Sequence, residues 1–321
     1  MAYIFGPVSS RRLGNSLGID PVPLKTCNFS CVYCQLGRTR RPVCTRGELI
    51  RTDAIVTEIR DVVPRYGPHD VDWVTFVGSG ETTLHSGLRC LLEAVRSSTD
   101  LPVAVITNGS LLYRSDVRRD LLLSDAVLPS LDAGTDVTYR RINRPHPSFP
   151  FKRHVEGLIE FRHVFDGKLW LEVMLVNGVN DTTPELTAIA AAIARIEPDE
   201  VHLTLPTRPP VEAWVEPPCD DGLARATLIL GSVARLISPQ ETTVTPHAEG
   251  DIIDAVHTII SRHPLREVEL VRILARWVPG HVAETLSILG ESGRVSVVER
   301  MDTRFWCAVE SDFADQEPNE A

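Results

Sequence analysis

The sequence predicts an α/β fold built on a mostly parallel sheet, and two patterns support this prediction. Short apolar segments rich in β-branched residues alternate, along residues 16–237, with amphipathic segments whose apolar residues recur at three- and four-residue spacing. The short segments are apolar almost throughout, which is typical of parallel strands covered on both faces. Six such units are two fewer than a complete eight-stranded barrel needs, so we expect a partial (β/α)6 barrel or an open sheet.

Residues that favour turns bound each expected strand, and each expected helix has one apolar face. In VDWVTFVG (71–78), β-branched and aromatic residues precede a glycine-rich turn, and in LHSGLRCLLEAVRSS (84–98) leucines recur at helical spacing. The expected strands, in chain order, are 16–23, 71–78, 102–108, 126–132, 169–176 and 200–206. The expected helices are 53–63, 84–98, 151–165, 184–197 and 222–237.

The pattern changes near residues 245–250. Helical spacing continues beyond this point and then gives way to an alternating segment around Met301 and Asp302, as in a two-stranded hairpin. Helices followed by a hairpin are the order of a winged-helix module. The expected elements are helices at 252–263, 265–278 and 281–293 and a hairpin at 294–310. The expected domains are a barrel at 1–245, a winged-helix-like domain at 250–310 and an acidic, disordered tail at 311–321.

Charge and composition limit the classes of function. The 321-residue chain has a net charge of −10, and residues from 250 onward carry −6, so we do not expect DNA binding. Residues 1–50 have seven Lys and Arg against two acids, which suits a solvated surface, an anionic substrate or an acidic electron donor. The sequence shows neither an apolar run that spans a bilayer nor a secretory leader, so we expect a cytoplasmic protein without membrane partners.

Three of the seven cysteines, Cys27, Cys31 and Cys34, fall within eight residues, directly after the first expected strand. In a reducing compartment, clustered thiols are more often metal ligands or catalytic groups than disulfides. Thiolates suit zinc or an iron–sulfur cluster. A structural zinc site needs four ligands, with Cys44 as a candidate fourth. Three cysteines on a [4Fe–4S] cluster leave one iron open to a substrate or cosubstrate.

Glycines and polar residues gather where the expected strands end, and the carboxyl ends of parallel strands carry the active site in such folds. The second strand runs into VGSGETT (77–83), whose glycines let the backbone approach a ligand closely. Ser130 and Asp132 lie two residues apart and are expected to share one face. Further candidates at strand ends are Asn108, Asn177 and Arg208.

The motif Cys27–x3–Cys31–x2–Cys34, with Tyr33 before its last cysteine, resembles the signature of the radical S-adenosylmethionine (SAM) superfamily. The segments GPVSSRRLGNSLGIDPVPLKTCNFSCVYCQLGRT, GSGETTLH and RINRPHP are similar to a group of iron–sulfur oxidoreductases related to wybutosine-type tRNA-modifying enzymes. The resemblance covers roughly residues 5–240 and implies a partial radical SAM barrel.

This resemblance implies that Cys27, Cys31 and Cys34 are catalytic ligands of a [4Fe–4S] cluster whose free iron binds SAM. One electron, from a donor such as flavodoxin or ferredoxin, would split SAM and release a 5′-deoxyadenosyl radical that abstracts hydrogen from the substrate. The loop at 78–81 would bind the SAM amino group, and Arg208 would pair with the SAM carboxylate. The cofactor-binding residues would be Tyr33, Gly78, Ser79, Gly80, Glu81, Asn108, Ser130, Asp132, Asn177 and Arg208.

The sequence leaves the substrate open. Basic residues around the cysteines favour RNA, the acidic winged-helix-like domain favours a peptide or protein, and a small molecule is a third option. The segment RRINRPHP (140–147) is expected to be either a solvated loop or a substrate-binding loop, with Arg140, Arg141, Arg144 and His146 as the binding residues. Another class of protein also stays open, a zinc-binding winged-helix regulatory or binding protein without catalysis.

Overall fold

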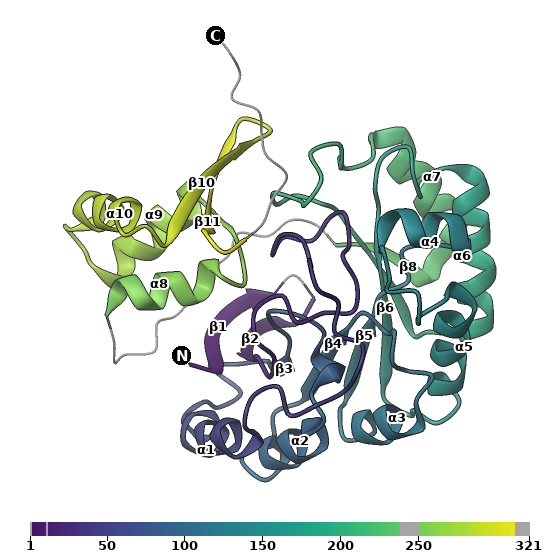
Figure 1. Cartoon of the computed structure of the whole chain (residues 1–321), viewed down its shortest axis with the longest axis horizontal. Helices are drawn as coiled ribbons and strands as arrows, with labels where there is room; N and C mark the ends of the chain where they lie inside the picture. The colour runs from purple at the N-terminus through teal and green to yellow at the C-terminus, as the bar shows by residue number, and fades with distance from the viewer. Residues whose placement is uncertain (1, 11, 238–250, 312–321) are drawn as a thin grey trace.

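A computed structural model describes residues 2–10, 12–237 and 251–311 of the chain. Within these residues eight strands form one sheet whose order follows the sequence (Figure 1). β1 (Ile4–Ser10) is antiparallel to β2 (Gly14–Ile19), and β2 to β8 are parallel, which is consistent with a partial barrel. The other strands are β3 (Trp73–Phe76), β4 (Val103–Thr107), β5 (Ala126–Pro129), β6 (Lys168–Met174), β7 (Glu200–Thr204) and β8 (Ala234–Leu236).

The six predicted strands correspond to β2–β7, whereas β1 and β8 are missing from the prediction. β1 contains Gly6 and Pro7, which weaken a strand pattern, and β8 is three residues long. The helix predicted over 222–237 is wrong beyond Leu230. There the chain adopts a positive φ of 74° at Gly231, which ends the helix and starts the short turn that leads into β8.

Seven helices join the strands and lie along the outer side of the curved sheet (Figure 1). They are α1 (Thr52–Val62), α2 (Leu88–Arg96), α3 (Ser115–Leu121), α4 (Asp136–Ile142), α5 (Phe151–Arg162), α6 (Thr183–Ile196) and α7 (Asp220–Leu230). Single 3-10 turns lie at η1 (Val63–Arg65), η2 (Thr82–Leu84) and η3 (Gly231–Val233). The main core fills the space between helices and sheet, where Ile59 of α1, Leu171 of β6 and Leu186 of α6 are fully buried.

The inner side of the sheet is closed at the amino ends of its strands. Leu13, in the turn between β1 and β2, packs with Ala126 and Trp170 in a separate apolar cluster. The rings of Trp73 and Trp170 meet edge to face with centroids 5.8 Å apart, a favourable aromatic geometry. Leu13 of this cluster also lines the cavity that lies inside the sheet, so the cluster forms part of the floor of that cavity.

Residues 251–311, which we call the C-terminal segment, contain three helices and a small sheet. These are α8 (Ile252–Ile260), β9 (Leu265–Arg266), α9 (Glu267–Trp277), α10 (Val282–Glu291), β10 (Val295–Arg300) and β11 (Thr303–Ala308). Met301 and Asp302 both have positive φ, as a tight hairpin turn requires. The predicted junction at 245–250 lies outside the described residues. The predicted tail at 311–321 does so as well, except for Ser311.

The C-terminal segment packs on the β1 edge of the large sheet. Its core, which includes Val256, Leu270 and Trp306, is continuous with Phe5 and Val8 of β1. Figure 1 shows α8 beside β1. Among the helices that the structure describes, none combines the length and the apolar character that a bilayer crossing requires.

An aromatic cluster lies beneath the loop that carries the three cysteines. Tyr139 stacks on His154 with ring centroids 5.3 Å apart and meets Phe29 edge to face at 5.6 Å. The Nε2 atom of His154 lies 3.0 Å from the carbonyl oxygen of Ser130. Burial lowers the pKa of His154 to about 4, although the hydrogen bond to Ser130 works in the opposite direction. His154 is therefore a neutral core residue at pH 7.

The buried position of Leu171 predicts a large loss of stability in the variant Leu171→Ala. The side chain is fully buried, so its truncation leaves a cavity and should lower the free energy of unfolding by about 3 kcal/mol. The matched control, Leu228→Ala on α7, removes a side chain that is 82% exposed and should cost less than about 0.5 kcal/mol. Urea unfolding followed by circular dichroism measures both; equal losses would contradict this core.

The environment of His154 predicts that stability falls as the pH decreases from about 6.5 to about 4. In this window the unfolded state binds a proton on His154, whose ordinary pKa is about 6.5, while the folded state does not. The residue should account for a loss of roughly 3 kcal/mol across the window. His154→Gln should therefore show a shallower pH dependence of the unfolding free energy than the native chain, and parallel pH profiles would refute this explanation.

Candidate active site

A cavity of about 380 Å³ lies inside the curved sheet, where the parallel strands end. Inward-facing residues such as Thr75 on β3, Glu172 on β6 and Thr204 on β7 line it, together with the loops beyond these strands. Of the residues proposed from the sequence, those that line this cavity are Cys27, Tyr33, Cys34, Gly78, Gly80, Glu81, Asn108, Ser130 and Arg208. The proposed residues that do not line it are Cys31, Ser79, Asp132 and Asn177.

Residues 20–51 form a long connection between β2 and α1 that we call the cysteine loop. It has no helix or long strand of its own, and other parts of the chain hold it in place. The amide of Val43 donates to the carbonyl of Cys27 at 2.9 Å, and the amide of Ser30 donates to the carbonyl of Asn143 at 3.2 Å. The loop is therefore shaped by its neighbours, which fixes the positions of its three thiols.

Each thiol of the motif has a hydrogen-bond donor close to its sulfur. The amide of Phe29 lies 3.4 Å from the Cys27 sulfur, and the side-chain amide of Asn108 lies 3.6 Å from the same atom. The Asn143 side-chain amide lies 3.7 Å from the Cys31 sulfur. The Lys25 ammonium lies 3.4 Å from the Cys34 sulfur. Donors and a cation beside sulfur stabilise thiolates, and such contacts tune iron–sulfur clusters.

The electrostatics of the thiols also fit a positively charged metal group. Burial raises the pKa of Cys27 to about 12, and the negative charge of Glu81 adds to this effect. Burial likewise raises the pKa of Cys31, with further contributions from Cys27 and Asp132. A metal centre displaces the thiol proton and replaces mutual repulsion by attraction, so it supplies what these sulfurs lack. The three cysteines thus suit a metal cluster.

A closed site for a single ion is not found. Cys44, the candidate fourth ligand, packs against the main core. Within residues 2–10, 12–237 and 251–311, no group of three or more His, Cys, Asp or Glu side chains is placed to hold one metal ion. The structure therefore gives no support to a four-ligand zinc site within these residues.

The residues 77–83, which we call the glycine loop, press against the cysteine loop. The amide of Lys25 donates to the carbonyl of Ser79 at 2.6 Å, and the amide of Glu81 donates to the carbonyl of Thr26 at 2.8 Å. A Cβ atom at Gly80 would overlap the carbonyl of Thr26, so only glycine allows this approach. The sequence predicts that these glycines let the backbone approach a ligand; in the structure Gly80 approaches the cysteine loop, and contact with a ligand stays a prediction.

The Glu81 carboxylate is buried and is hydrogen-bonded to neighbouring residues of the protein. It accepts hydrogen bonds from the amide of Thr83 at 2.9 Å, the hydroxyl of Thr107 at 2.5 Å and the amide of Asn108 at 2.6 Å. Burial raises its pKa even though these donors favour the carboxylate. Glu81 thus joins the glycine loop to the end of β4, and Asn108 extends the chain of contacts to the Asn28 side chain at 2.7 Å.

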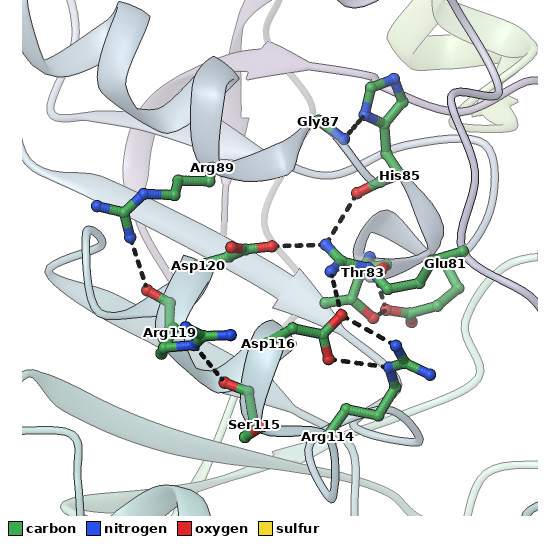
Figure 2. A network of polar contacts seen from close by, with 11 residues as sticks. Glu81, Thr83, His85, Gly87, Arg89, Arg114, Ser115, Asp116, Arg119 and Asp120 are labelled. Carbon is green, nitrogen blue, oxygen red and sulfur yellow. Dashed lines mark hydrogen bonds and ion pairs between the residues drawn. The ribbon is translucent and has the colours of Figure 1, made fainter.

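Arg46 anchors the far end of the cysteine loop to α3 and to residues 83–85. Its guanidinium pairs with Asp116 at 3.0 Å and Asp120 at 2.6 Å and donates to the carbonyls of Thr83 and His85. Figure 2 shows both aspartates, which lie on α3, directed toward the same point from one side. Sequence analysis missed this role, because Arg46 counted only toward the basic excess of residues 1–50.

Asp132 is a buried support for the Cys31 side of the site. Its carboxylate accepts the Tyr33 hydroxyl at 2.5 Å, the Asn143 side-chain amide at 2.6 Å and the Met174 backbone amide at 2.8 Å. Burial raises its pKa, and the three donors oppose this shift. Since Asn143 also contacts the Cys31 sulfur, Asp132 orients that amide and the Tyr33 ring.

The remaining candidates differ in position. Ser130 lines the cavity and follows β5, and Arg208 lines it from the loop after β7 and donates to the Gln35 side chain at 3.0 Å. Asn177 is exposed, and its backbone amide donates to the carbonyl of Glu216 at 2.9 Å. The buried asparagine of this turn is Asn180, which accepts the amide of Val176 at 2.7 Å. The structure therefore does not bring Asn177 to the cavity.

The segment 140–147 supports the cysteine loop and lines a separate hollow of about 310 Å³. The amide of His146 donates to the carbonyl of Asn28 at 3.0 Å. Arg144 forms an ion pair with Glu212, and Arg140 pairs with Asp136 at 2.8 Å. A role in binding substrate stays a prediction for this segment.

Two charged residues inside the cavity were not foreseen. Arg12, from the turn between β1 and β2, pairs with Glu172 of β6, and both line the cavity above its floor. The Ser16 and Thr75 hydroxyls meet at 2.5 Å on the neighbouring wall. Side chains alternate along β6, so Glu172 and Met174 lie on the same face of the strand and both line the cavity. This alternation could have predicted that Glu172 faces inward.

Comparisons with known proteins agree with this arrangement. A family model described as the radical SAM superfamily matches residues 22–190, which include the three cysteines of the motif and the glycine loop. A UPF0026 protein of Methanocaldococcus jannaschii is 34% identical over 281 residues, which are 85% of this chain and 86% of that protein. The GTPase Obg of Brachyspira hyodysenteriae is 38% identical over 295 residues, which are 91% of this chain; the chain spans 43% of that protein's length.

Solved structures share the fold at low sequence identity. A radical SAM methyltransferase from Sphaerobacter thermophilus aligns with a TM-score of 0.50 and 17% identity over 69% of this chain and 65% of its own. The enzyme anSMEcpe, with AdoMet and the Kp18Cys peptide, aligns with a TM-score of 0.50 and 15% identity over 67% and 58%. TYW1, with a lysine–pyruvate adduct, aligns with a TM-score of 0.46 and 13% identity over 96% and 84%. The match of the family model over more than half of the sequence shows that the chain belongs to the radical SAM superfamily.

Proposed function

We propose that this protein is a radical SAM enzyme whose cluster and cosubstrate meet in the cavity at the carboxyl ends of the strands. The observation that carries the proposal is the position of Cys27 and Cys34 on the wall of that cavity, which Gly78 and Gly80 of the glycine loop also line. A [4Fe–4S] cluster with one iron free of protein ligands, together with SAM, supplies a 5′-deoxyadenosyl radical that abstracts a hydrogen atom from a substrate.

Cys27, Cys31 and Cys34 would hold the cluster, and their neighbours would stabilise the charge on the sulfurs. The amides of Asn108 and Asn143 and the ammonium of Lys25 are the donors within reach of the three thiols. A donor beside a ligating sulfur lowers its electron density and makes reduction of a cluster easier. These three side chains are therefore assigned to tuning the site rather than to contact with the substrate.

Most residues that line the cavity are assigned to SAM, and buried residues whose polar groups are bound within the protein are assigned to positioning. Backbone groups at Gly78 and Gly80 would face the amino group, and the Arg208 guanidinium suits the carboxylate. Further wall positions assigned to SAM are Tyr33, Asn108 and Ser130. Ser79, Glu81 and Asp132 are assigned to holding these walls, because their polar groups are engaged with the protein. Asn177 receives no role at this site.

The closed floor would keep water away from the reacting groups. The apolar cluster of Leu13 and Trp170 seals the amino ends of the strands, so access is from the loop side. A cavity of about 380 Å³ accommodates a cofactor and a group of modest size. The substrate is therefore assigned to small molecules, or to a single side chain or nucleotide that a peptide, protein or RNA inserts.

The C-terminal segment and the basic part of the cysteine loop are assigned to binding partner molecules. The order of helices and hairpin in residues 251–311 supports a winged-helix-like module that guides a peptide or protein, whereas its acidity disfavours DNA. Arg40 and Arg41 are exposed on the cysteine loop beyond Cys34, which suits an acidic electron donor such as flavodoxin or ferredoxin.

Anaerobic turnover tests the proposed function. The reconstituted protein, incubated with SAM and dithionite, should release 5′-deoxyadenosine, because the proposed site would hold the cluster and SAM in one cavity. Peptide, metabolite and RNA fractions should be added separately, and the fraction that accelerates release identifies the substrate class. A colourless protein that contains one zinc ion per chain, and releases no 5′-deoxyadenosine, would favour the non-catalytic zinc-binding alternative instead.

Single substitutions of the cysteines test the ligand set. Cys31→Ala should lose most of the bound iron and the brown absorption, because two cysteines cannot hold the cluster. Cys44→Ala is the matched control in the same loop and should keep iron and absorption unchanged, since Cys44 packs against the core. Iron and sulfide analysis after anaerobic reconstitution measures both variants. Loss of iron in Cys44→Ala, with retention in Cys31→Ala, would overturn the assignment.

A further inference from the structure

The corner that follows α8, residues 261–263, reaches from the C-terminal segment to the wall of the cavity. His263 lines the cavity together with Cys34 and Gly78, although more than 180 residues separate it from either of them in the sequence. Arg262, beside it, is 7% exposed. A cation so deeply buried is rare unless it is paired, so its partners indicate what the corner does.

The partner of Arg262 is Asp20, which is 2% exposed and lies just beyond β2. The Nε atom of Arg262 donates to one carboxylate oxygen of Asp20 at 2.8 Å. Asp20 in turn accepts the Ser79 backbone amide at 3.1 Å and the Ser79 hydroxyl at 2.6 Å. A Cβ atom at Gly78 would overlap the same carboxylate. The aspartate therefore lies between Arg262 and the glycine loop and touches both.

Other contacts keep the Arg262 guanidinium in this place. It donates to the carbonyl of Thr258 at 3.0 Å and to the carbonyl of Ala2 at 3.2 Å. It also lies over the ring of Phe5, 4.8 Å from the centroid, as in a cation–π contact. A planar guanidinium satisfies all of these partners at once, and an ammonium cannot.

A second connection runs from the same corner to the cysteine loop. The side-chain amide of Gln35, next to Cys34, donates to the carbonyl of Arg262 at 3.0 Å and lies 3.2 Å from Nδ1 of His263. The oxygen of that amide accepts from Arg208 at 3.0 Å. The corner thus contacts both loops that form the candidate cofactor site.

We propose that Arg262 is a positioning residue for SAM: it fixes Asp20, and through Asp20 the glycine loop, so that the C-terminal segment completes the cofactor site. The inference rests on the proposed function, because it concerns the loop assigned to SAM. Without Arg262 the Asp20 carboxylate stays buried beside the glycine loop without its cation, a costly arrangement that the loop relieves by moving. Cluster binding does not depend on this route, since the three cysteines have their own donors.

The central experiment compares SAM affinity in full-length, anaerobically reconstituted variants by equilibrium dialysis. Arg262→Gln should retain iron and sulfide but bind SAM roughly 10–100-fold more weakly, as is usual when a supporting partner is removed. Arg262→Lys should recover part of the affinity. It restores a positive charge beside the Asp20 carboxylate but not the contacts that need a planar guanidinium. The control Arg304→Gln removes an exposed arginine that pairs with Glu267 at 2.9 Å and should bind SAM like the native protein.

A spectroscopic measurement separates positioning from general stability. Addition of SAM to the reduced cluster should change the electron paramagnetic resonance spectrum of the native protein and of Arg304→Gln, but not of Arg262→Gln at the same SAM concentration. Circular dichroism establishes that each variant is folded. If folded Arg262→Gln binds SAM within twofold of the native protein, the inference is overturned.

The variant Ser79→Ala decides the question if Arg262→Gln does not fold. It removes the hydroxyl that binds Asp20 from the other side and leaves the C-terminal segment intact, so SAM should bind about fivefold more weakly with the cluster retained. Native-like affinity of Ser79→Ala would overturn the inference. Failure of the native protein to bind a cluster or SAM at all would instead refute the proposed function, so the two failures are distinguishable.

Discussion

The backbone of the glycine loop touches the backbone of the cysteine loop, and this contact decides where the cavity lies. It arises because β2 and β3 are adjacent and parallel, so the segments that leave them emerge at the same edge of the sheet. Gly80 against Thr26 leaves no room for a side chain between them. With this pair in place, Cys27 and Cys34 of the cysteine loop and Gly78 and Gly80 of the glycine loop line one cavity.

Three buried carboxylates, Asp20, Glu81 and Asp132, follow β2, β3 and β5, and each one holds a wall of that space. Each accepts hydrogen bonds from a neighbouring loop, and each is at most 3% exposed. Burial of a carboxylate is tolerable only with such donors. These three carboxylates therefore serve to hold the loops around the cavity, whereas Arg12, Glu172 and Arg208 are charged groups on its wall.

The sequence allowed the βα order and the cysteine motif to be predicted, because both depend on local patterns. It did not allow the choice between Asn177 and Asn180, which is set by how the chain turns after β6. The roles of Arg46 and Arg262 also escaped prediction, since each pairs with acids far away in the chain and an arginine in isolation looks like a solvated one. The helix beyond Leu230 failed because Gly231 adopts a positive φ that apolar spacing does not reveal.

The ion pair between Arg262 and Asp20 joins positions 242 residues apart. A ribosome that adds roughly 5–20 residues per second reaches the arginine roughly 10–50 s after the aspartate. During that interval the Asp20 carboxylate has its Ser79 donors but not its arginine. Docking of residues 251–311 onto the β1 edge is therefore the step that gives this buried aspartate its cation.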